Sequence, residues 1–84
     1  MHYVYFIKSL KDGKYYIGYT DDLERRLKEH HSEGSSYTQK RGPWELIYFE
    51  AYQTKRLALI REQKLKKSSW HKKEVIDRIM EQEI

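Results

Sequence analysis

The sequence contains no cysteine, which excludes disulfide bonds and thiolate metal sites. It has no apolar run of transmembrane length, and its N-terminus lacks the hydrophobic segment of a signal peptide. A cytoplasmic protein without a membrane partner is therefore expected. No low-complexity stretch or long linker divides the 84 residues, so we expect one domain over residues 1–84 with a small core.

Apolar residues are in short supply, because hydrophobic residues make up 38% of the chain and eight of them are tyrosines. A buried tyrosine ring carries a hydroxyl group that needs a hydrogen-bond partner or water. We therefore expect some of the tyrosines to surround a polar site as well as to fill the core.

Basic residues outnumber acidic ones by 17 to 13, and the excess is concentrated between positions 55 and 73. This basic stretch contains eight lysine or arginine residues and a single acid, Glu62. Such a local charge favours a polyanionic partner, and nucleic acid is the commonest one, because each phosphate that is neutralised releases condensed counterions. A solvated basic helix explains the same composition, and the charge alone does not decide between the two.

Three segments rich in β-branched and aromatic residues predict strands over residues 2–8, 15–19 and 44–52. Asp12-Gly13 predicts a turn between the first two strands, which then form a hairpin. Residues 32–43 contain the only proline and predict a loop.

Capping side chains and the helical spacing of apolar residues predict three helices. They run from about Asp22 to His31, from Thr54 to about Lys67, and from Ser68 or Ser69 onward. The last helix has an apolar face made of Val75, Ile76, Ile79 and Met80. The order ββαβαα describes an α+β fold in which helices flank a three-stranded, mainly antiparallel sheet.

The hairpin places Tyr5 and Tyr16 on one face of the sheet, together with Gly18. A two-residue turn pairs Tyr5 with Thr20, whereas a four-residue loop pairs Tyr5 with Tyr16. Both registers keep the two tyrosines on the same face, but only the second sets them directly opposite each other. The missing side chain at Gly18 lets another group approach the backbone. Ordinary core packing of the tyrosines is the alternative.

In the first predicted helix, a rotation of about 100° per residue puts Arg26 and His30 beside the buried stripe of Leu23 and Leu27. Arg25 points to solvent in the same projection. Arg26 could bind a phosphate through its planar guanidinium group, and His30 could transfer a proton near neutral pH. A surface ion pair for Arg26 and a core-edge position for His30 explain the pattern equally well.

Glu62 is placed unusually, because it lies on the same helical stripe as Ala58 and Leu65. A carboxylate there could hold a hard divalent cation whose other ligands are water and phosphate oxygens, as in many Mg²⁺ sites. The alternative is an ion pair with a nearby basic residue, namely Arg61, Lys66 or Arg26.

Five short elements follow one another in an order that is typical of one family. They are Tyr3-Val4-Tyr5, Tyr16-Ile17-Gly18, the helical segment Asp22–His30, Tyr37-Thr38, and Arg61-Glu62 with the lysines that follow. In this order and spacing, over residues 3 to 67, the chain resembles the GIY-YIG nuclease domain, and most closely its small stand-alone members.

The resemblance implies a metal-dependent endonuclease that hydrolyses phosphodiester bonds in DNA, with RNA as a further substrate and structure-selective repair or recombination as a context. By this likeness, Glu62 would bind one Mg²⁺ or Mn²⁺ ion and Arg26 would offset charge on the phosphate. Tyr5 or Tyr16 would accept the proton of the attacking water, with His30 as a relay. A phenol needs a lowered pKa for this role, because its ordinary value is about 10.

Two features depart from the family. The first triplet begins Tyr-Val, and the sequence contains no asparagine, although many members carry one after the glutamate helix. Ser68, Ser69 and Lys72 are the candidates to take its place. The residues expected to contact nucleic acid are Tyr37, Lys40, Arg41, Lys55, Arg61, Lys64, Lys66 and Lys67.

Two other functions remain open at this point. One is a nucleic-acid-binding module that uses the basic stretch without cutting. The other is a protein-interaction domain that uses Trp44 and Trp70, and a protein partner or a homodimer is compatible with each function.

Overall fold

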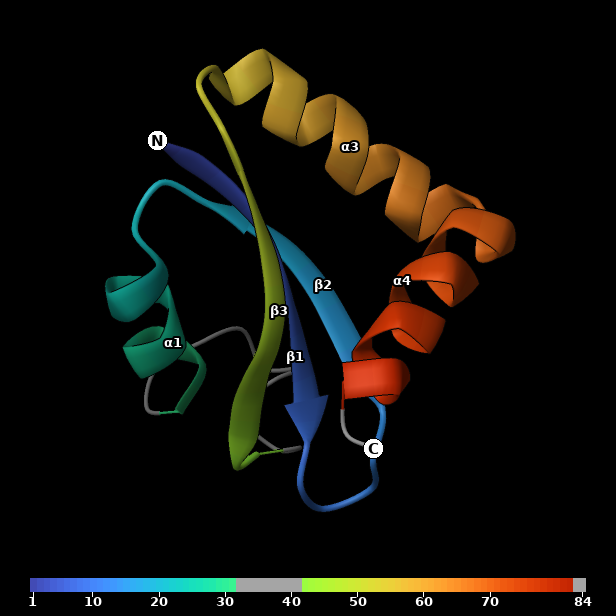
Figure 1. The fold of residues 1–84 in the computed structure, drawn as a ribbon. Coiled ribbons are helices and arrows are strands. Elements are labelled where there is room, and N and C mark those ends of the chain that lie inside the picture. The colour runs from blue at the N-terminus through green and yellow to red at the C-terminus, as the bar shows by residue number, and fades with distance from the viewer. Residues whose placement is uncertain (32–41, 83–84) are drawn as a thin grey trace.

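The computed structural model describes residues 1–31 and 42–82, and Figure 1 gives their arrangement. These residues form three strands and three helices in the predicted order, which confirms the α+β fold class. The elements are β1 (His2–Ser9), β2 (Tyr15–Thr20), α1 (Leu23–His31), β3 (Trp44–Tyr52), α3 (Lys55–Lys67) and α4 (Ser69–Gln82). Most of the predicted loop over residues 32–43 lies outside the described residues.

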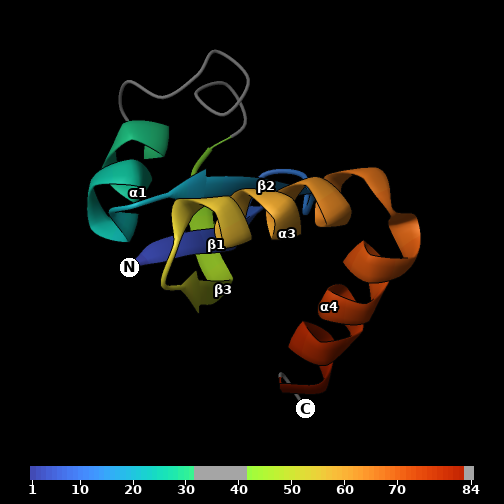
Figure 2. The ribbon, with the colours of Figure 1, turned by 90° about the horizontal axis from the view of Figure 1, so that it is seen from above.

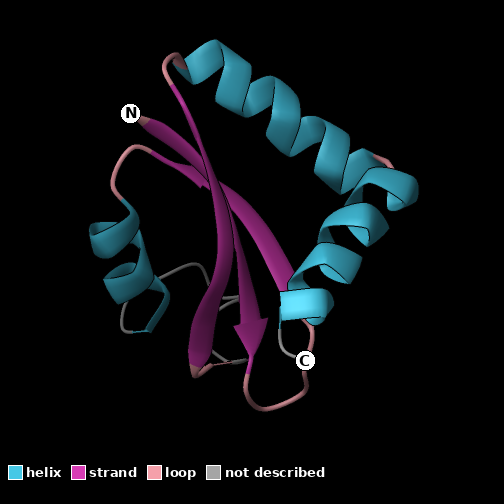
Figure 3. Cartoon of the chain, in the orientation of Figure 1, coloured by secondary structure: helices cyan, strands magenta, loops and turns pink. Residues whose placement is uncertain are grey.

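The sheet has the strand order β2-β1-β3, and both pairs of neighbouring strands are antiparallel (Figure 3). Tyr5 therefore lies on the central strand and Tyr16 on an edge strand. Both expected hairpin registers are wrong, because Tyr5 pairs with Gly18 and Tyr16 pairs with Ile7. The two tyrosines still share a face, as predicted, but they are diagonal neighbours.

The hairpin loop explains this register. The Ser9 backbone N–H donates to the Lys14 carbonyl at 2.8 Å, so four residues form the loop. The Ser9 hydroxyl oxygen accepts from the backbone N–H groups of Lys11 and Asp12, at 3.2 and 3.3 Å. Gly13 completes the loop with a φ of 75°, which glycine adopts at little cost. The loop therefore has four residues, as in the longer of the two expected turns, but it lies one residue later in the chain than the pairing of Tyr5 with Tyr16 requires.

Helices cover both faces of the sheet, with α1 on one side and α3 and α4 on the other (Figures 1 and 2). Under α3 and α4, the main core cluster consists of Val4, Phe6, Ile17, Ala58, Leu65, Val75 and Ile79. Under α1, a smaller cluster consists of Tyr5, Ile7 and Trp44, with Leu23 and Leu27 packed against it. The tyrosines singled out in the sequence thus belong to the smaller cluster, whose core is partly polar.

Side-chain caps define the ends of the helices. The Thr54 hydroxyl oxygen accepts from the Leu57 backbone N–H at 3.2 Å and starts α3, as predicted. Ser68 separates α3 from α4, because its N–H donates to the Lys64 carbonyl at 2.9 Å and its carbonyl accepts from the Lys72 N–H at 3.1 Å. No described helix is long and apolar enough to cross a membrane.

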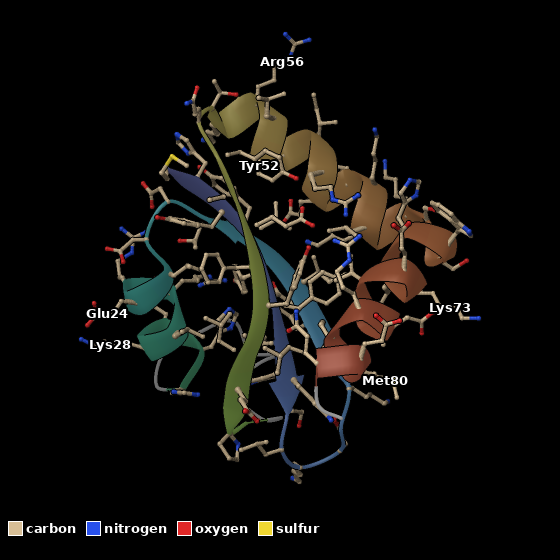
Figure 4. The ribbon with its side chains drawn as sticks, in the orientation of Figure 1. Glu24, Lys28, Tyr52, Arg56, Lys73 and Met80 are labelled. Atoms are coloured by element: carbon tan, nitrogen blue, oxygen red, sulfur yellow. The ribbon has the colours of Figure 1, made fainter. Side chains whose placement is uncertain are left out.

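The apolar face predicted for the last helix is narrower than expected. Val75 and Ile79 are buried, and Ile76 packs against the core, but Met80 is 56% exposed. Figure 4 shows Met80 and Lys73 pointing away from the sheet, whereas Tyr52 lies between β3 and α3. The position of Met80 on the buried face was therefore a wrong prediction, because α4 contacts the sheet along a stripe centred on Val75 and Ile79.

Candidate active site

The side chain of Tyr5 extends from the central strand β1 over the edge strand β2. Its ring lies directly over Gly18, where a Cβ atom would overlap the Tyr5 hydroxyl group and would stand 2.5 Å from Cζ. Any larger residue at position 18 would therefore displace the ring. Gly18 thus permits the close approach that the sequence predicted, and the approaching group is the phenol of Tyr5 itself.

The Tyr5 hydroxyl group joins two side chains of α1. It lies 2.8 Å from His30 Nε2, and Arg26 Nε donates to it at 3.3 Å. Because a guanidinium group can only donate, we assign the Tyr5 hydroxyl hydrogen to the bond with His30 Nε2. This assignment leaves the proton of the neutral imidazole on Nδ1, which is buried and has no hydrogen-bond partner among the described residues.

The helix projection made from the sequence agrees with these positions. The Arg26 side chain is 26% exposed and the Arg25 side chain 58%. His30 is only 1% exposed, so its ring lies inside the smaller cluster. Arg26 therefore faces the site, and Arg25 pairs with Asp21 at 2.9 Å on the surface.

Burial determines the protonation of this group. Burial lowers the pKa of His30 to about 4, and the charges of Arg26 and His31 act in the same direction. Burial raises the pKa of Tyr5 to about 12, although the hydrogen bond and charge of Arg26 oppose the change. Without a cation the pKa of Tyr5 is therefore raised, because the desolvation of the phenolate outweighs the attraction of the Arg26 guanidinium group.

Tyr16 has a different environment from Tyr5, because it is half-buried on the edge strand. Its ring meets the His30 ring edge to face, with centroids 5.2 Å apart, and it also contacts Trp44. A nucleic acid at the edge of the sheet could reach the phenol of Tyr16 more easily than that of Tyr5. Of the two tyrosines, Tyr16 is therefore the more accessible to a substrate.

Glu62 approaches the same group from α3. It is 8% exposed, on a stripe with the fully buried Ala58 and Leu65. Its Oε2 atom lies 3.3 Å from Lys66 Nζ, and this Nζ lies 6.0 Å from the centroid of the Tyr16 ring. The carboxylate is also near enough to Tyr5 for its charge to raise the pKa of that phenol further.

The donor set suits a hard divalent cation with few protein ligands. Within residues 1–31 and 42–82, no group of three or more His, Asp or Glu side chains could hold a metal. Glu62 would therefore be a single carboxylate ligand. Mg²⁺ commonly accepts one carboxylate together with waters and phosphate oxygens. The residues present fit Mg²⁺ or Mn²⁺ held by Glu62 and completed by substrate.

Arg61 does not join Tyr5 and Tyr16 but binds Glu50 on β3. Its Nε and Nη2 atoms donate to the two carboxylate oxygens at 2.9 and 3.1 Å. The hydroxyl groups of Tyr48 and Tyr52 donate to the same carboxylate at 2.6 and 2.7 Å. Burial alone would raise the pKa of Glu50, but these hydrogen bonds lower it. The guanidinium group of Arg61 is thus engaged inside the protein.

Glu50 was missed in the sequence. Strand alternation places it on one face with Tyr48 and Tyr52, which is the face that α3 covers. An acid on a covered face needs a basic partner, and this pattern could have indicated that one arginine of α3 pairs with it.

The other residues expected to contact nucleic acid are more dispersed. Lys55, Lys64 and Lys67 are exposed on α3, and Lys55 Nζ lies 5.9 Å from the centroid of the Tyr19 ring. Tyr37, Lys40 and Arg41 lie outside the described residues. Of the candidates to replace the asparagine, Ser68 is occupied, because its Oγ lies 2.7 Å from His71 Nδ1.

The sequence of residues 1–74 matches the family model described as the GIY-YIG catalytic domain. The chain belongs to the GIY-YIG family. Its two signature triplets lie side by side on β1 and β2. Gly18 of the second triplet leaves room for the ring of Tyr5, the tyrosine of the first triplet. The GIY-YIG match covers all five elements on which the resemblance was based.

Several similar proteins carry the name UPF0213. A UPF0213 protein of Haloquadratum walsbyi is 43% identical over 87% of this chain and 82% of its own length. UPF0213 protein YazA of Bacillus subtilis is 44% identical over 88% and 75%. The solution structure of a UPF0213 protein from Bacillus halodurans has a TM-score of 0.56 and 42% identity, over 93% and 83% of the two chains. These names state no reaction, so the similarity establishes the family and leaves the substrate open.

Proposed function

We propose that the protein is a metal-dependent endonuclease that hydrolyses phosphodiester bonds in DNA, and that Tyr5, Tyr16, Arg26, His30 and Glu62 carry the reaction. The single observation behind the proposal is the convergence of these side chains from β1, β2, α1 and α3. A phenol, a guanidinium group and a carboxylate within reach of one another form a set suited to a phosphate ester.

Tyr16 is the group that orients the attacking water and accepts its proton. Its half-buried position supports this role, since Tyr5 is 1% exposed and its hydroxyl group is occupied by two neighbours. A general base must come within hydrogen-bond reach of the proton it removes. The more exposed tyrosine is therefore the better candidate for the base. Tyr5 is then a positioning residue that holds Arg26 and His30 in place.

Arg26 stabilises the negative charge that grows on the phosphoryl oxygens in the transition state. Tyr5 holds only its Nε atom, and Nη1 lies 3.7 Å from the Glu29 carboxylate, which is a loose contact. Among the described residues, the guanidinium group is therefore oriented by its hydrogen bond to Tyr5, and its other N–H groups can donate to a phosphate.

Glu62 is the protein ligand of the divalent cation. When bound, Mg²⁺ or Mn²⁺ polarises the scissile phosphate and stabilises the departing oxygen. The burial of Glu62 beside the tyrosines supports this assignment, because a carboxylate on an apolar stripe needs a counter-ion. Exposed lysines of α3, among them Lys64 and Lys67, supply the attraction for the nucleic-acid backbone.

The test is a cleavage and binding assay on branched, nicked and single-stranded DNA, and on RNA, with Mg²⁺ or Mn²⁺. We expect the wild-type protein to cut, and Glu62→Ala and Arg26→Ala to lose at least about 100-fold in rate while they still bind nucleic acid. Arg25→Ala is the matched control, because Arg25 is on the same helix and faces solvent. Binding without cleavage by the wild-type protein would overturn the nuclease proposal in favour of a binding module.

A further inference from the structure

Lys66 differs from the other lysines in the last turn of α3. These are Lys64, Lys66 and Lys67, and in the described part of the chain only Lys66 forms an ion pair with an acid, at 3.3 Å from Glu62 Oε2. The same Nζ faces the Tyr16 ring at 6.0 Å. Lys66 therefore lies between the carboxylate and the phenol of the candidate site.

The two partners of this ion pair differ in exposure. The Glu62 side chain is 10% exposed and is held on the apolar stripe of α3. The Lys66 side chain is 42% exposed and carries its charge on a flexible four-carbon stem. The carboxylate is thus fixed and the ammonium group can leave it.

We propose that Lys66 is an exchangeable counter-ion of Glu62, which neutralises the carboxylate in the metal-free protein and moves to a phosphate of the nucleic acid when a divalent cation binds. This inference rests on the proposed function, because it assumes that Glu62 holds the cation. It adds a regulation of the site, in which one lysine serves two anions in turn.

Electrostatics makes the exchange necessary. A buried carboxylate beside Tyr16 requires a positive neighbour, and Lys66 provides one without a metal. A divalent cation on the same carboxylate repels the ammonium group at this short distance, so Lys66 must turn away. The nearest unmet negative charge is then the phosphate that completes the metal shell.

The exchange couples two binding events. Metal binding releases Lys66 for nucleic acid, and nucleic acid that binds Lys66 exposes Glu62 to metal. Because such coupling is reciprocal, each ligand must tighten the binding of the other by the same factor. Removing Lys66 should therefore strengthen metal binding in the absence of nucleic acid and weaken the coupling.

The first test measures Mn²⁺ binding to the full chain without nucleic acid, by calorimetry and by electron paramagnetic resonance. We expect Lys66→Gln to bind Mn²⁺ about two- to fivefold more tightly than the wild type, since a competing ion pair of this exposure is lost. Lys67→Gln removes the same charge from the same turn and should change the affinity by less than twofold. Equal effects of the two substitutions, or none, would overturn the exchange.

The second test measures the affinity for a short DNA duplex at several salt concentrations, with and without Mn²⁺, in an Arg26→Ala background that keeps the DNA intact. With metal, Lys66→Gln should reduce the slope of log affinity against log salt by about one, as expected for one lost phosphate contact. Without metal it should leave the slope unchanged. A reduction that is the same with and without metal would contradict the exchange.

Neither readout requires cleavage. A protein that binds Mn²⁺ and DNA with these couplings but never cuts would overturn the proposed function and support the exchange. A protein that cuts, and whose Mn²⁺ affinity is insensitive to Lys66, would do the reverse.

Discussion

Two regions of the molecule bury charged and polar groups in different ways. Between β3 and α3, the Glu50 carboxylate receives four hydrogen bonds, two from Arg61 and one each from Tyr48 and Tyr52. Under α1 and at the edge of β2, the polar groups are less completely paired. Within residues 1–31 and 42–82, the buried Nδ1 of His30 has no hydrogen-bond partner, and Glu62 pairs with Lys66, whose side chain is 42% exposed.

This difference distinguishes residues that stabilise the fold from residues that take part in binding or catalysis. A fully satisfied buried network fixes one packing arrangement and has no capacity left for a ligand. A group with an unpaired donor and a loosely held carboxylate costs stability, and such cost is usual where a protein binds or transforms something. Substitutions in the two regions should therefore have different effects: those in the Glu50 network should reduce stability, and those around Tyr16 and Glu62 should reduce activity.

The largest expected effect is a loss of cleavage rate from a substitution in the region around Tyr16. We expect Tyr16→Phe to reduce the cleavage rate by about 10²- to 10⁴-fold, because it removes the group that accepts the proton. Tyr5→Phe should reduce the rate less, since it loses the hydrogen bonds that hold Arg26 and His30. Single-turnover cleavage with saturating DNA would measure both. A larger loss of cleavage rate in Tyr5→Phe than in Tyr16→Phe would reverse the roles assigned to the two tyrosines.

The second effect concerns the satisfied network. Glu50→Ala leaves Arg61 half-buried without its partner and should lower the free energy of unfolding by about 2–3 kcal/mol. Urea denaturation followed by circular dichroism would measure the loss. Glu74→Ala breaks an exposed pair with Arg78 at 3.4 Å and should cost less than about 1 kcal/mol. Equal costs for the two changes would show that the network does not stabilise the fold.

The third effect is a pH dependence that arises from His30. Its pKa is about 4 in the folded protein and about 6.5 in an unfolded chain, so the unfolded state binds the proton first. Stability should therefore decrease as the pH falls from 6.5 towards 4. Between pH 7 and pH 5 the loss should be about 2 kcal/mol.

Urea unfolding at the two pH values measures this dependence, and His30→Gln should remove most of it. Proton NMR of the imidazole gives an independent measurement that does not depend on the stability of a variant. A His30 signal that titrates near pH 6.5 in the folded protein would contradict a buried neutral ring.

Much of the fold and part of the site could be predicted from the sequence. The strands and helices follow from periodicity and capping residues, and the shared face of Tyr5 and Tyr16 follows from strand alternation alone. The orientation of Arg26 towards the site and of Arg25 towards solvent follows from helix geometry. These features depend on residues close together in the chain, where the backbone imposes the spacing.

Other features could not be predicted in this way. The hairpin register depends on where the four-residue loop begins, and the hydrogen bonds of the Ser9 hydroxyl group and the conformation of Gly13 decide this. Among the basic residues of α3, the sequence could not tell that Arg61 pairs with Glu50 whereas Lys66 pairs with Glu62. That choice depends on which side of α3 meets β3 and which meets β2.

Local spacing and motifs are enough to predict the elements, their order, the faces of the strands and the family to which the chain belongs. Long-range packing is needed to know which tyrosine is buried, which is accessible, and which basic residue pairs with each acid. Burial and pairing depend on contacts between segments far apart in the chain. Desolvation by those contacts makes Tyr5 a weaker acid than its type alone would suggest.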